Sequence, residues 1–308
     1  MATTVTPAIE NSIGLASRYL PILDEIYKAE SKSSILDTAE SRVRWSDEYR
    51  TFYLFETDMG GLADYDRNDG FVRGDVTANW RAYTPQWDRA RQFLVDIADN
   101  SESLSLAFGT LAGEFMRTKV IPETDALRFA TYANGAAAAN KDTESLANSA
   151  AVIASIDDAT AALDDAEVPY EGRILFVNPT IYKLIKGGVT RMVMNGDNNI
   201  DYNVLMYNDM RLITVPSGRF NTEITLAKPD SHDDAGGYTA TGSTINYMIV
   251  HPTAVMQAVK LAMPRIFSPQ VVQEADAWQY DFRQYHGAWV KHQKTNGIYV
   301  SAASFPSA

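Results

Sequence analysis

Residues 121–128 read Ile-Pro-Glu-Thr-Asp-Ala-Leu-Arg and lie in the middle of a long stretch with helical spacing. Apolar side chains recur three or four positions apart on both sides of this octapeptide, as on one face of a helix. The residues that carry the pattern are Leu104, Phe108, Leu111 and Phe115, followed by Leu127, Ala130 and Ala133 or Asn134. Because proline lacks an N–H and clashes with the preceding turn, we expect one long helix with a kink or break at Pro122.

The chain before this helix predicts an arm and a long hairpin. Residues 7–44 carry a helical stripe that Pro21 interrupts, and we expect this arm to lie on the protein's own body. Residues 51–55 and 79–83 are rich in aromatic and β-favouring residues, with turn-forming Gly, Asp and Asn between them. Because an isolated two-stranded hairpin is marginally stable in water, this excursion should find a partner surface. A short alternating strand is expected at Phe93, Val95 and Ile97.

The chain after the long helix has the pattern of an α/β region. An alanine-rich stretch, residues 135–149, marks a boundary, and Val152, Ile156 and Leu163 indicate a further helix. Asn178-Pro179 predicts a helix N-terminus and Gly187-Gly188 its end. Strands are expected at 173–177, 212–215 and 245–250, with an alternating strand through Trp278, Tyr280 and Phe282. We also expect a helix from His251-Pro252 through Lys260, and a terminal hairpin that joins 288–292 to 298–300 through Asn296-Gly297.

The composition indicates a folded, acidic protein. Its 308 residues are 45% hydrophobic and 21% charged, which is ordinary for a globular chain of about two domains. The absence of cysteine excludes disulfides, a thiol nucleophile and thiolate metal sites. The net charge of −12 disfavours nucleic-acid binding, because a protein that binds phosphates requires a basic surface. The first residues lack a secretory signal, and no run of about 18 apolar residues is present, so we expect a soluble protein that stays inside the cell that makes it.

The sequence predicts no catalytic, cofactor-binding or metal site. The glycine pairs lack the continuation of a phosphate-binding loop, and Pro216-Ser217-Gly218 is not a nucleophile elbow. His286 and His292 lie six positions apart, which suits neither one helix face nor a tight metal loop, so both are interpreted as surface or strand histidines. The acidic pairs Asp157-Asp158 and Asp164-Asp165 are interpreted as a solvated helix face. We therefore expect a protein that is not an enzyme.

One acidic loop leaves an alternative open. Asp64, Asp66 and Asn68 precede Gly70, and Asp75 stands twelve positions from Asp64 counted inclusively. This spacing approaches that of a calcium loop, but the glycine is one residue late and the closing acid is Asp where a bidentate Glu is usual. A solvated hairpin tip is the favoured interpretation, and a calcium-dependent binding protein is the least favoured alternative. The loop at residues 197–201 is interpreted in the same way.

The order of these elements resembles that of the major capsid proteins of tailed bacteriophages, which have the Hong Kong 97-type fold that encapsulin shells share. Three segments carry the resemblance. Residues 88–96 (Asp-Arg-Ala-Arg-Gln-Phe-Leu-Val-Asp) resemble the strand that leaves the family's extended loop, and residues 121–128 resemble its spine helix. Residues 274–298, which include Tyr285-His286-Gly287-Ala288-Trp289-Val290, resemble its closing strands, and residues 168–182 and 214–220 fit the pattern of its axial domain.

The resemblance implies an α+β fold of the Hong Kong 97 type, divided into five segments. Residues 1–47 would be an N-terminal arm and residues 48–85 the extended loop, which lies over a neighbouring subunit. The peripheral domain would comprise residues 86–133, with the spine helix, and residues 263–308, with the closing strands. Residues 134–262 would form the axial domain.

The resemblance also implies a function and partners. The chain would self-assemble as pentamers and hexamers into the icosahedral capsid of a virion that encloses a double-stranded DNA genome, and assembly would take place in the host cytoplasm. A portal and possible decoration proteins are implied, and membrane association is not. Too few residues precede the loop for a built-in scaffold, so we expect a separate scaffolding protein or a prior cleavage. Because residues 51–85 contain no lysine, cross-linking of a loop lysine to a neighbouring asparagine is not expected.

Two expectations and one alternative follow from this resemblance. An acidic shell lining would repel DNA, so that the genome could be packed and ejected without sticking. Replacing Trp80 and Tyr83 with Ala should weaken contacts between subunits more than the folding of each subunit. The alternative is an encapsulin-like compartment shell with the same fold and an enzyme cargo, which shell diameter and neighbouring genes would distinguish.

Overall fold

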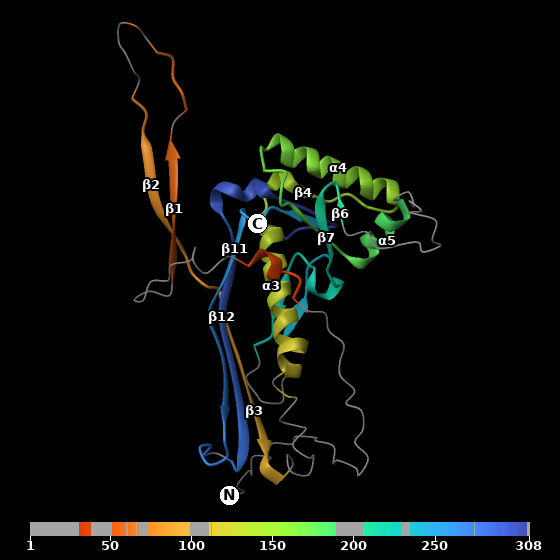
Figure 1. Cartoon of the computed structure of the whole chain (residues 1–308). Helices are drawn as coiled ribbons and strands as arrows, with labels where there is room; N and C mark the ends of the chain where they lie inside the picture. The colour runs from red at the N-terminus through yellow and green to blue at the C-terminus, as the bar shows by residue number, and fades with distance from the viewer. Residues whose placement is uncertain are drawn as a thin grey trace, which may run out of the picture.

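The computed structural model describes residues 31–37, 51–59, 61–65, 67, 73–98, 111, 113–188, 206–228, 235–273 and 275–306. The fold is a mixed arrangement of helices and sheets (Figure 1). No helix within these ranges is long and apolar enough to cross a membrane.

The largest sheet has six strands in the order β4-β13-β10-β5-β7-β6. The strands are β4 (Lys141–Asp142), β5 (Ile174–Val177), β6 (Met206–Tyr207), β7 (Met210–Thr214), β10 (Ile245–Val250) and β13 (Ile298–Ala302). β10 is antiparallel to β5 and to β13, whereas β5 runs parallel to β7. Every residue of β5 is buried, as expected for a strand that is covered on both faces of its sheet.

Helices cover both faces of this sheet. Helices α4 (Ser149–Asp165) and α5 (Pro179–Gly188) place Val152, Ile156 and Ile185 against Leu175 and Ile249. On the other face, α3 (Ile121–Gly135) packs its aromatic residues against the sheet. The core on that side contains Phe129, Tyr132, Phe176, Phe220, Met248 and Val300. The result is a three-layer arrangement with two apolar cores, one on each side of the sheet.

A second sheet is built from the three longest strands. It has the order β11-β12-β3, with β11 (Val255–Phe267), β12 (Ala277–Val290) and β3 (Trp87–Asp96) all antiparallel to their neighbours. Figure 1 shows these strands running alongside α3. The strand predicted around Phe93 and Val95 is confirmed and begins earlier, at Trp87, while Ile97 lies just beyond its end.

The long helix continues through Pro122 by means of a wide turn. The turn η3 (Met116–Val120) is π-helical and leads directly into α3, with Pro122 in the first turn of α3. A wide turn removes the requirement for the N–H that proline lacks. The predicted kink is therefore a π-turn within a continuous helix from residue 113 to residue 135. Leu104 and Phe108 lie outside the described residues.

Two small hairpins complete the described strands. β1 (Phe52–Met59) and β2 (Val76–Tyr83) pair antiparallel over their full length, which confirms the predicted two-stranded excursion. Figure 1 shows this hairpin projecting away from α4 and α5. β8 (Ile224–Leu226) pairs with β9 (Tyr238–Ala240) near α3. Short 3₁₀ turns lie at η1 (Ser34–Leu36), η4 (Ala138–Asn140), η5 (Ser217–Arg219) and η6 (His292–Gly297).

The predicted helix N-terminus at Asn178-Pro179 is confirmed. Asn178 accepts a hydrogen bond at 2.8 Å from the backbone N–H of Ile181, as a helix N-cap does. Asn148 caps α4 in the same way through the N–H of Ala151. α5 is described as far as Gly188, and the residues that follow lie outside the described chain, so the predicted end at Gly187-Gly188 stays a prediction. The cap at Asn178 could be predicted because capping depends on short-range geometry.

The helix predicted from His251-Pro252 through Lys260 is wrong. A tight turn at residues 252–254 leads into β11, which pairs with β12 over twelve positions. A bulge between Val259 and Leu261 shifts the register and breaks the period-two alternation that would have indicated a strand. Pairing with a long neighbouring strand therefore overrides the apparent helical spacing.

The predicted terminal hairpin is also wrong. β12 ends at Val290 in the three-stranded sheet, and η6 carries the chain to β13, which pairs with β10 and β4 in the other sheet. Asn296-Gly297 is therefore part of a crossover between sheets. A Cβ at Gly297 would lie 2.6 Å from the Cβ of Ala254, so glycine permits a close approach at this position.

The predicted segment boundaries stay a prediction. The six-stranded sheet nevertheless takes β13 from residues 263–308 and the rest of its strands from residues 134–262. Two segments that the resemblance assigns to different domains thus share one sheet.

Candidate assembly surfaces and the pocket beside them

The hairpin β1–β2 has one apolar face. In its register Tyr53 is opposite Ala82, Thr57 opposite Ala78, and Met59 opposite Val76, and Trp80 lies between Ala78 and Ala82 on the same face. Directly paired residues share a face, as do residues two positions apart in a strand. Met59, Val76 and Trp80 are each about two-thirds exposed. A contiguous apolar surface of this kind marks an interaction site.

From Glu56 toward the tip, the opposite face of the hairpin is polar, with Glu56, Thr77 and Asn79. Toward the base the same face carries Leu54 opposite Arg81 and Phe52 opposite Tyr83. The carboxylate of Glu56 accepts a hydrogen bond from the Tyr83 hydroxyl at 3.2 Å and lies 3.6 Å from Nε of Arg81. Beyond its base the hairpin is therefore an amphipathic ribbon. We call Tyr53, Met59, Val76, Ala78, Trp80 and Ala82 the apolar face of the hairpin.

The base of the hairpin is fixed to the three-stranded sheet. The Tyr83 ring packs edge-on against Trp289 at 6.1 Å between centroids, and both belong to one buried apolar cluster with Met256. Burial together with the Glu56 carboxylate raises the pKa of Tyr83. Further along β1, Nε2 of Gln293 in η6 donates to the Thr57 carbonyl at 3.1 Å. The sequence-based expectation grouped Tyr83 with Trp80 as contacts between subunits, but Tyr83 is 7% exposed and belongs to the subunit's own core.

Residues 31–37, at the end of the predicted arm, lie on the body of the same chain. The side chain of Asp125 on α3 is fully buried and accepts hydrogen bonds from the Ser31 and Ser33 hydroxyls, both at 2.7 Å. The backbone N–H of Lys32 donates to it as well, at 2.9 Å. Nη1 of Arg219 on η5 lies 3.1 Å from the same carboxylate. Asp125 therefore ties three separate parts of the chain together.

A second group of polar contacts continues this attachment. Arg128 donates to the Ser33 hydroxyl at 2.9 Å and pairs with Asp37 at 3.3 Å. Nε2 of Gln257 on β11 donates to the Ser33 carbonyl and to Asp37, and its Oε1 accepts from the Tyr132 hydroxyl. Complete burial raises the pKa of Tyr132 well above its ordinary value. Segment 31–37 is thus held on both α3 and β11.

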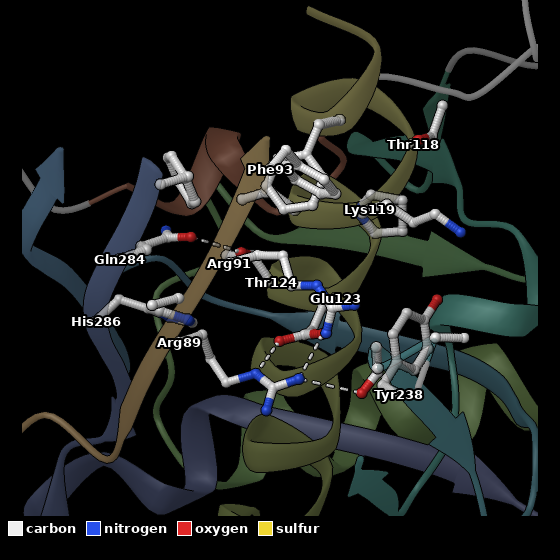
Figure 2. Close-up of a pocket in the computed structure, with 18 residues that line it drawn as sticks. Arg89, Arg91, Phe93, Thr118, Lys119, Glu123, Thr124, Tyr238, Gln284 and His286 are labelled. Carbon is white, nitrogen blue, oxygen red and sulfur yellow. Dashed lines mark hydrogen bonds and ion pairs between the residues drawn. The ribbon is translucent and has the colours of Figure 1, made fainter. Parts of the chain in front are cut away.

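A pocket of about 480 Å³ lies between β3, the long helix and β12, with residues 235–238 along one side (Figure 2). Arg89 on β3 forms a bidentate pair with Glu123 on α3, at 2.6 and 3.2 Å. The same guanidinium donates to the Ala227 and Gly237 carbonyls beside the β8–β9 hairpin. Arg89 thereby holds one wall of the pocket in place.

His286 lines this pocket and is 2% exposed. Its ring lies 5.2 Å from that of Trp87. Desolvation lowers the pKa of His286 to about 4, with smaller contributions from the charges of Arg128 and Arg89. The imidazole is therefore neutral at physiological pH. The prediction of a strand histidine is confirmed, since His286 lies in β12.

The residues of the two predicted acidic loops lie only partly within the described chain. Asp64 and Asp75 are exposed, whereas Asp66 and Asn68 lie outside the described residues, as does the loop at 197–201. No three His, Asp or Glu side chains of the described ranges gather as metal ligands would. Because two of its proposed ligands lie outside the described residues, the calcium-loop alternative stays untested.

The other singled-out residues make ordinary structural contacts. Asp157 accepts hydrogen bonds from Tyr207 and Asn208, and Asp164 pairs with the buried Arg173 at 2.6 Å. Ser217 lies in the 3₁₀ turn η5, which follows β7. His292 is exposed, and His232 lies outside the described residues. All four acids on α4 are exposed, which confirms the predicted solvated face, although Asp157 and Asp164 also bind neighbouring side chains.

Comparison with solved structures finds the same fold in phage particles. A chain of Mycobacterium phage Che8 aligns with a TM-score of 0.65 and 14% identity over 97% of this chain and 100% of its own length. A chain of the cyanophage P-SCSP1u capsid aligns with a TM-score of 0.67 and 10% identity, over 95% and 93%. For the bacteriophage PhiM1 mature capsid the values are 0.65 and 12%, over 94% and 93%.

No protein-family model matches the sequence, and neither does any curated protein. The identities to the solved structures are low, so these matches establish the fold. The resemblance to phage capsid proteins that the sequence indicated is confirmed at that level, over nearly the whole chain.

Proposed function

We propose that this chain is the major capsid protein of a tailed phage and that it self-assembles, as pentamers and hexamers, into an icosahedral shell around a double-stranded DNA genome. The observation that carries the proposal is the amphipathic hairpin β1–β2, anchored at its base and apolar on one outer face. The shared fold with chains of phage capsids supports it. The role is structural, without a catalytic step.

The apolar face of the hairpin supplies the contact between copies. Burying a large apolar side chain contributes roughly 1.5–3 kcal/mol, and Tyr53, Met59, Val76 and Trp80 all have exposed area to lose. A neighbouring copy that covers this face would remove that area from water. Because each copy both extends a hairpin and receives one, such contacts propagate around a closed ring or shell.

The rest of the subunit serves as the rigid frame for these contacts. In the proposed division residues 1–47 are an arm and residues 48–85 the extended loop. Residues 86–133 and 263–308 form the peripheral domain, and residues 134–262 the axial domain. The attachment of segment 31–37 to Asp125 and Gln257 supports an arm that begins on its own subunit.

The acidic composition fits a shell that holds DNA without binding it in a sequence-specific way. A net charge of −12 repels phosphates, so a packed genome would not adhere to its container. We include a separate scaffolding protein, a portal and a possible decoration protein as partners in the proposal, with assembly in the host cytoplasm. A strongly basic inner surface of the assembled shell would contradict the charge argument.

Sedimentation velocity of the purified chain tests the proposal. We expect rapidly sedimenting rings or shells for the unaltered protein, and single subunits for a Trp80→Ser/Val76→Ser variant whose subunit fold is intact by circular dichroism. A matched variant, Thr77→Ser/Asn79→Ser, changes the polar face of the same strand and should assemble normally. Equal assembly of both double variants would contradict a role for the apolar face.

A further inference from the structure

The pocket of Figure 2 combines a surplus of positive charge with an aromatic wall. Its lining carries three cationic side chains, Arg89, Arg91 and Lys119, and one carboxylate, Glu123. This surplus is local, because the whole chain has a net charge of −12. Glu123 already accepts two hydrogen bonds from Arg89. Because that pair is neutral, Lys119 leaves the lining with positive charge that a second anion complements.

Two polar groups of the pocket have unused hydrogen-bonding capacity within the described chain. Nδ1 of His286 is buried without a partner there. Arg89 has five N–H donors, of which four meet Glu123, Ala227 and Gly237. Arg89 lies opposite Gln284 in the sheet register, so His286, two positions further, shares its face. A buried polar group left unsatisfied costs about 1–3 kcal/mol, which an oxygen ligand would remove.

The other end of the pocket is aromatic. Phe93 and Phe115 pack edge to face with centroids 4.9 Å apart, and Phe282 lies 5.9 Å from Phe115. All three line the cavity, and Figure 2 shows Phe93 at the end away from the Arg89–Glu123 pair. The volume of about 480 Å³ is within the range of roughly 300–1,000 Å³ that small-ligand sites occupy.

We propose that this pocket binds an apolar group that carries a carboxylate. The apolar part lies against Phe93 and Phe115, while the carboxylate accepts hydrogen bonds from Nδ1–H of His286 and from Nη1 of Arg89, close to the positive charge of the lining. A glutamate beside an aromatic residue in an extended peptide offers this chemistry, and so does a free arylalkyl carboxylate. The proposal does not depend on the shell function.

Isothermal titration calorimetry with the full chain tests the site, using three probes. These are 3-phenylpropionate, acetyl-Glu-Phe-Glu-amide and acetyl-Gln-Phe-Gln-amide. We expect both carboxylate probes to bind, and the glutamine peptide to bind at least about tenfold more weakly, which corresponds to ~1.4 kcal/mol. An acidic peptide that binds about tenfold tighter than 3-phenylpropionate identifies a peptide as the source, whereas equal affinities identify a small molecule.

Variants locate the binding within the molecule. Lys119 is an exposed lining residue, and Lys119→Glu should weaken the carboxylate probes about tenfold. Lys183→Glu makes the same charge change at an exposed position on α5 and should leave affinity unchanged. His286→Phe should weaken binding as well, with its fold checked by thermal melting. Absence of binding by both carboxylate probes, equal binding of the glutamine peptide, or equal loss in the two lysine variants would overturn the proposal.

Discussion

Asp125 shows how a single residue can hold distant segments of this fold together. Its carboxylate accepts hydrogen bonds from residues 31–33 and pairs with Arg219, and both charged side chains are almost fully buried. A buried ion pair adds little net stability compared with apolar packing. Removal of one partner, however, leaves the other charge buried and unpaired, which is strongly destabilising. The sequence could not have identified Asp125, because its partners lie more than ninety positions away.

Asp125→Asn should lower the free energy of unfolding of the unassembled subunit by about 3–5 kcal/mol. The subunit is destabilised because the buried charge of Arg219 loses its partner and the hydroxyls of Ser31 and Ser33 lose their carboxylate acceptor. The matched control is Asp88→Asn, which breaks the exposed pair with Arg283 and should cost less than about 1 kcal/mol. Urea denaturation measures both, and similar losses would contradict the assigned role.

His286 gives the subunit a pH-dependent stability. Its folded pKa of about 4 lies below the ordinary 6.5, so between these values the unfolded chain binds more protons. Stability is therefore lost as pH falls from about 6.5 through 4, by up to about 3 kcal/mol. Urea denaturation from pH 7 to pH 4 should show this loss reduced in His286→Phe and unchanged in His292→Gln. Identical pH profiles for His286→Phe and the unaltered subunit would contradict it.

Among the helices and strands, features that depend on neighbouring residues could be predicted from the sequence. Features that depend on pairing with distant residues could not. The cap at Asn178 and the buried strands β5 and β10 could be predicted because each depends on neighbouring residues. β11 was mistaken for a helix because its bulge disturbs the alternation, and only its pairing with β12 defines it. The crossover through η6 was mistaken for a hairpin because Asn-Gly is also a turn signal.

Gly297→Ala tests the close packing of that crossover. The new Cβ would lie 2.6 Å from the Cβ of Ala254, and such overpacking costs about 1–3 kcal/mol. Gly218→Ala is the matched control, since a Cβ there meets nothing within 4 Å. Thermal melting should show a lower midpoint for Gly297→Ala alone, and equal midpoints would contradict the steric argument.

Different residues of the hairpin make the contacts between copies and the contacts within a single subunit. Trp80→Ser should leave the unfolding free energy of the subunit within about 0.5 kcal/mol while it weakens assembly, because Trp80 is 66% exposed. Tyr83→Ala should lower subunit stability by about 3–5 kcal/mol, because its ring packs on Trp289. Urea denaturation and sedimentation velocity measure the two effects, and a large stability loss in Trp80→Ser would contradict this division.

At the scale of the whole molecule, two sheets and the long helix form one frame. α3 packs against the six-stranded sheet on one side and against β12 on the other, and β13 follows β12 directly through η6. The order of elements was readable from the sequence because each has its own local pattern. The pocket and the polar attachment of segment 31–37 were not, since they form only where elements distant in the chain meet.

Assembly is the central claim, and electron microscopy tests it most directly. Negative-stain images of the purified chain, at moderate salt and over a range of protein concentrations, should show closed shells or ring-shaped capsomers. Their diameter would distinguish a genome-sized capsid from a small compartment. Compact particles of single-chain size at every concentration, from protein whose fold is intact by circular dichroism, would contradict the account.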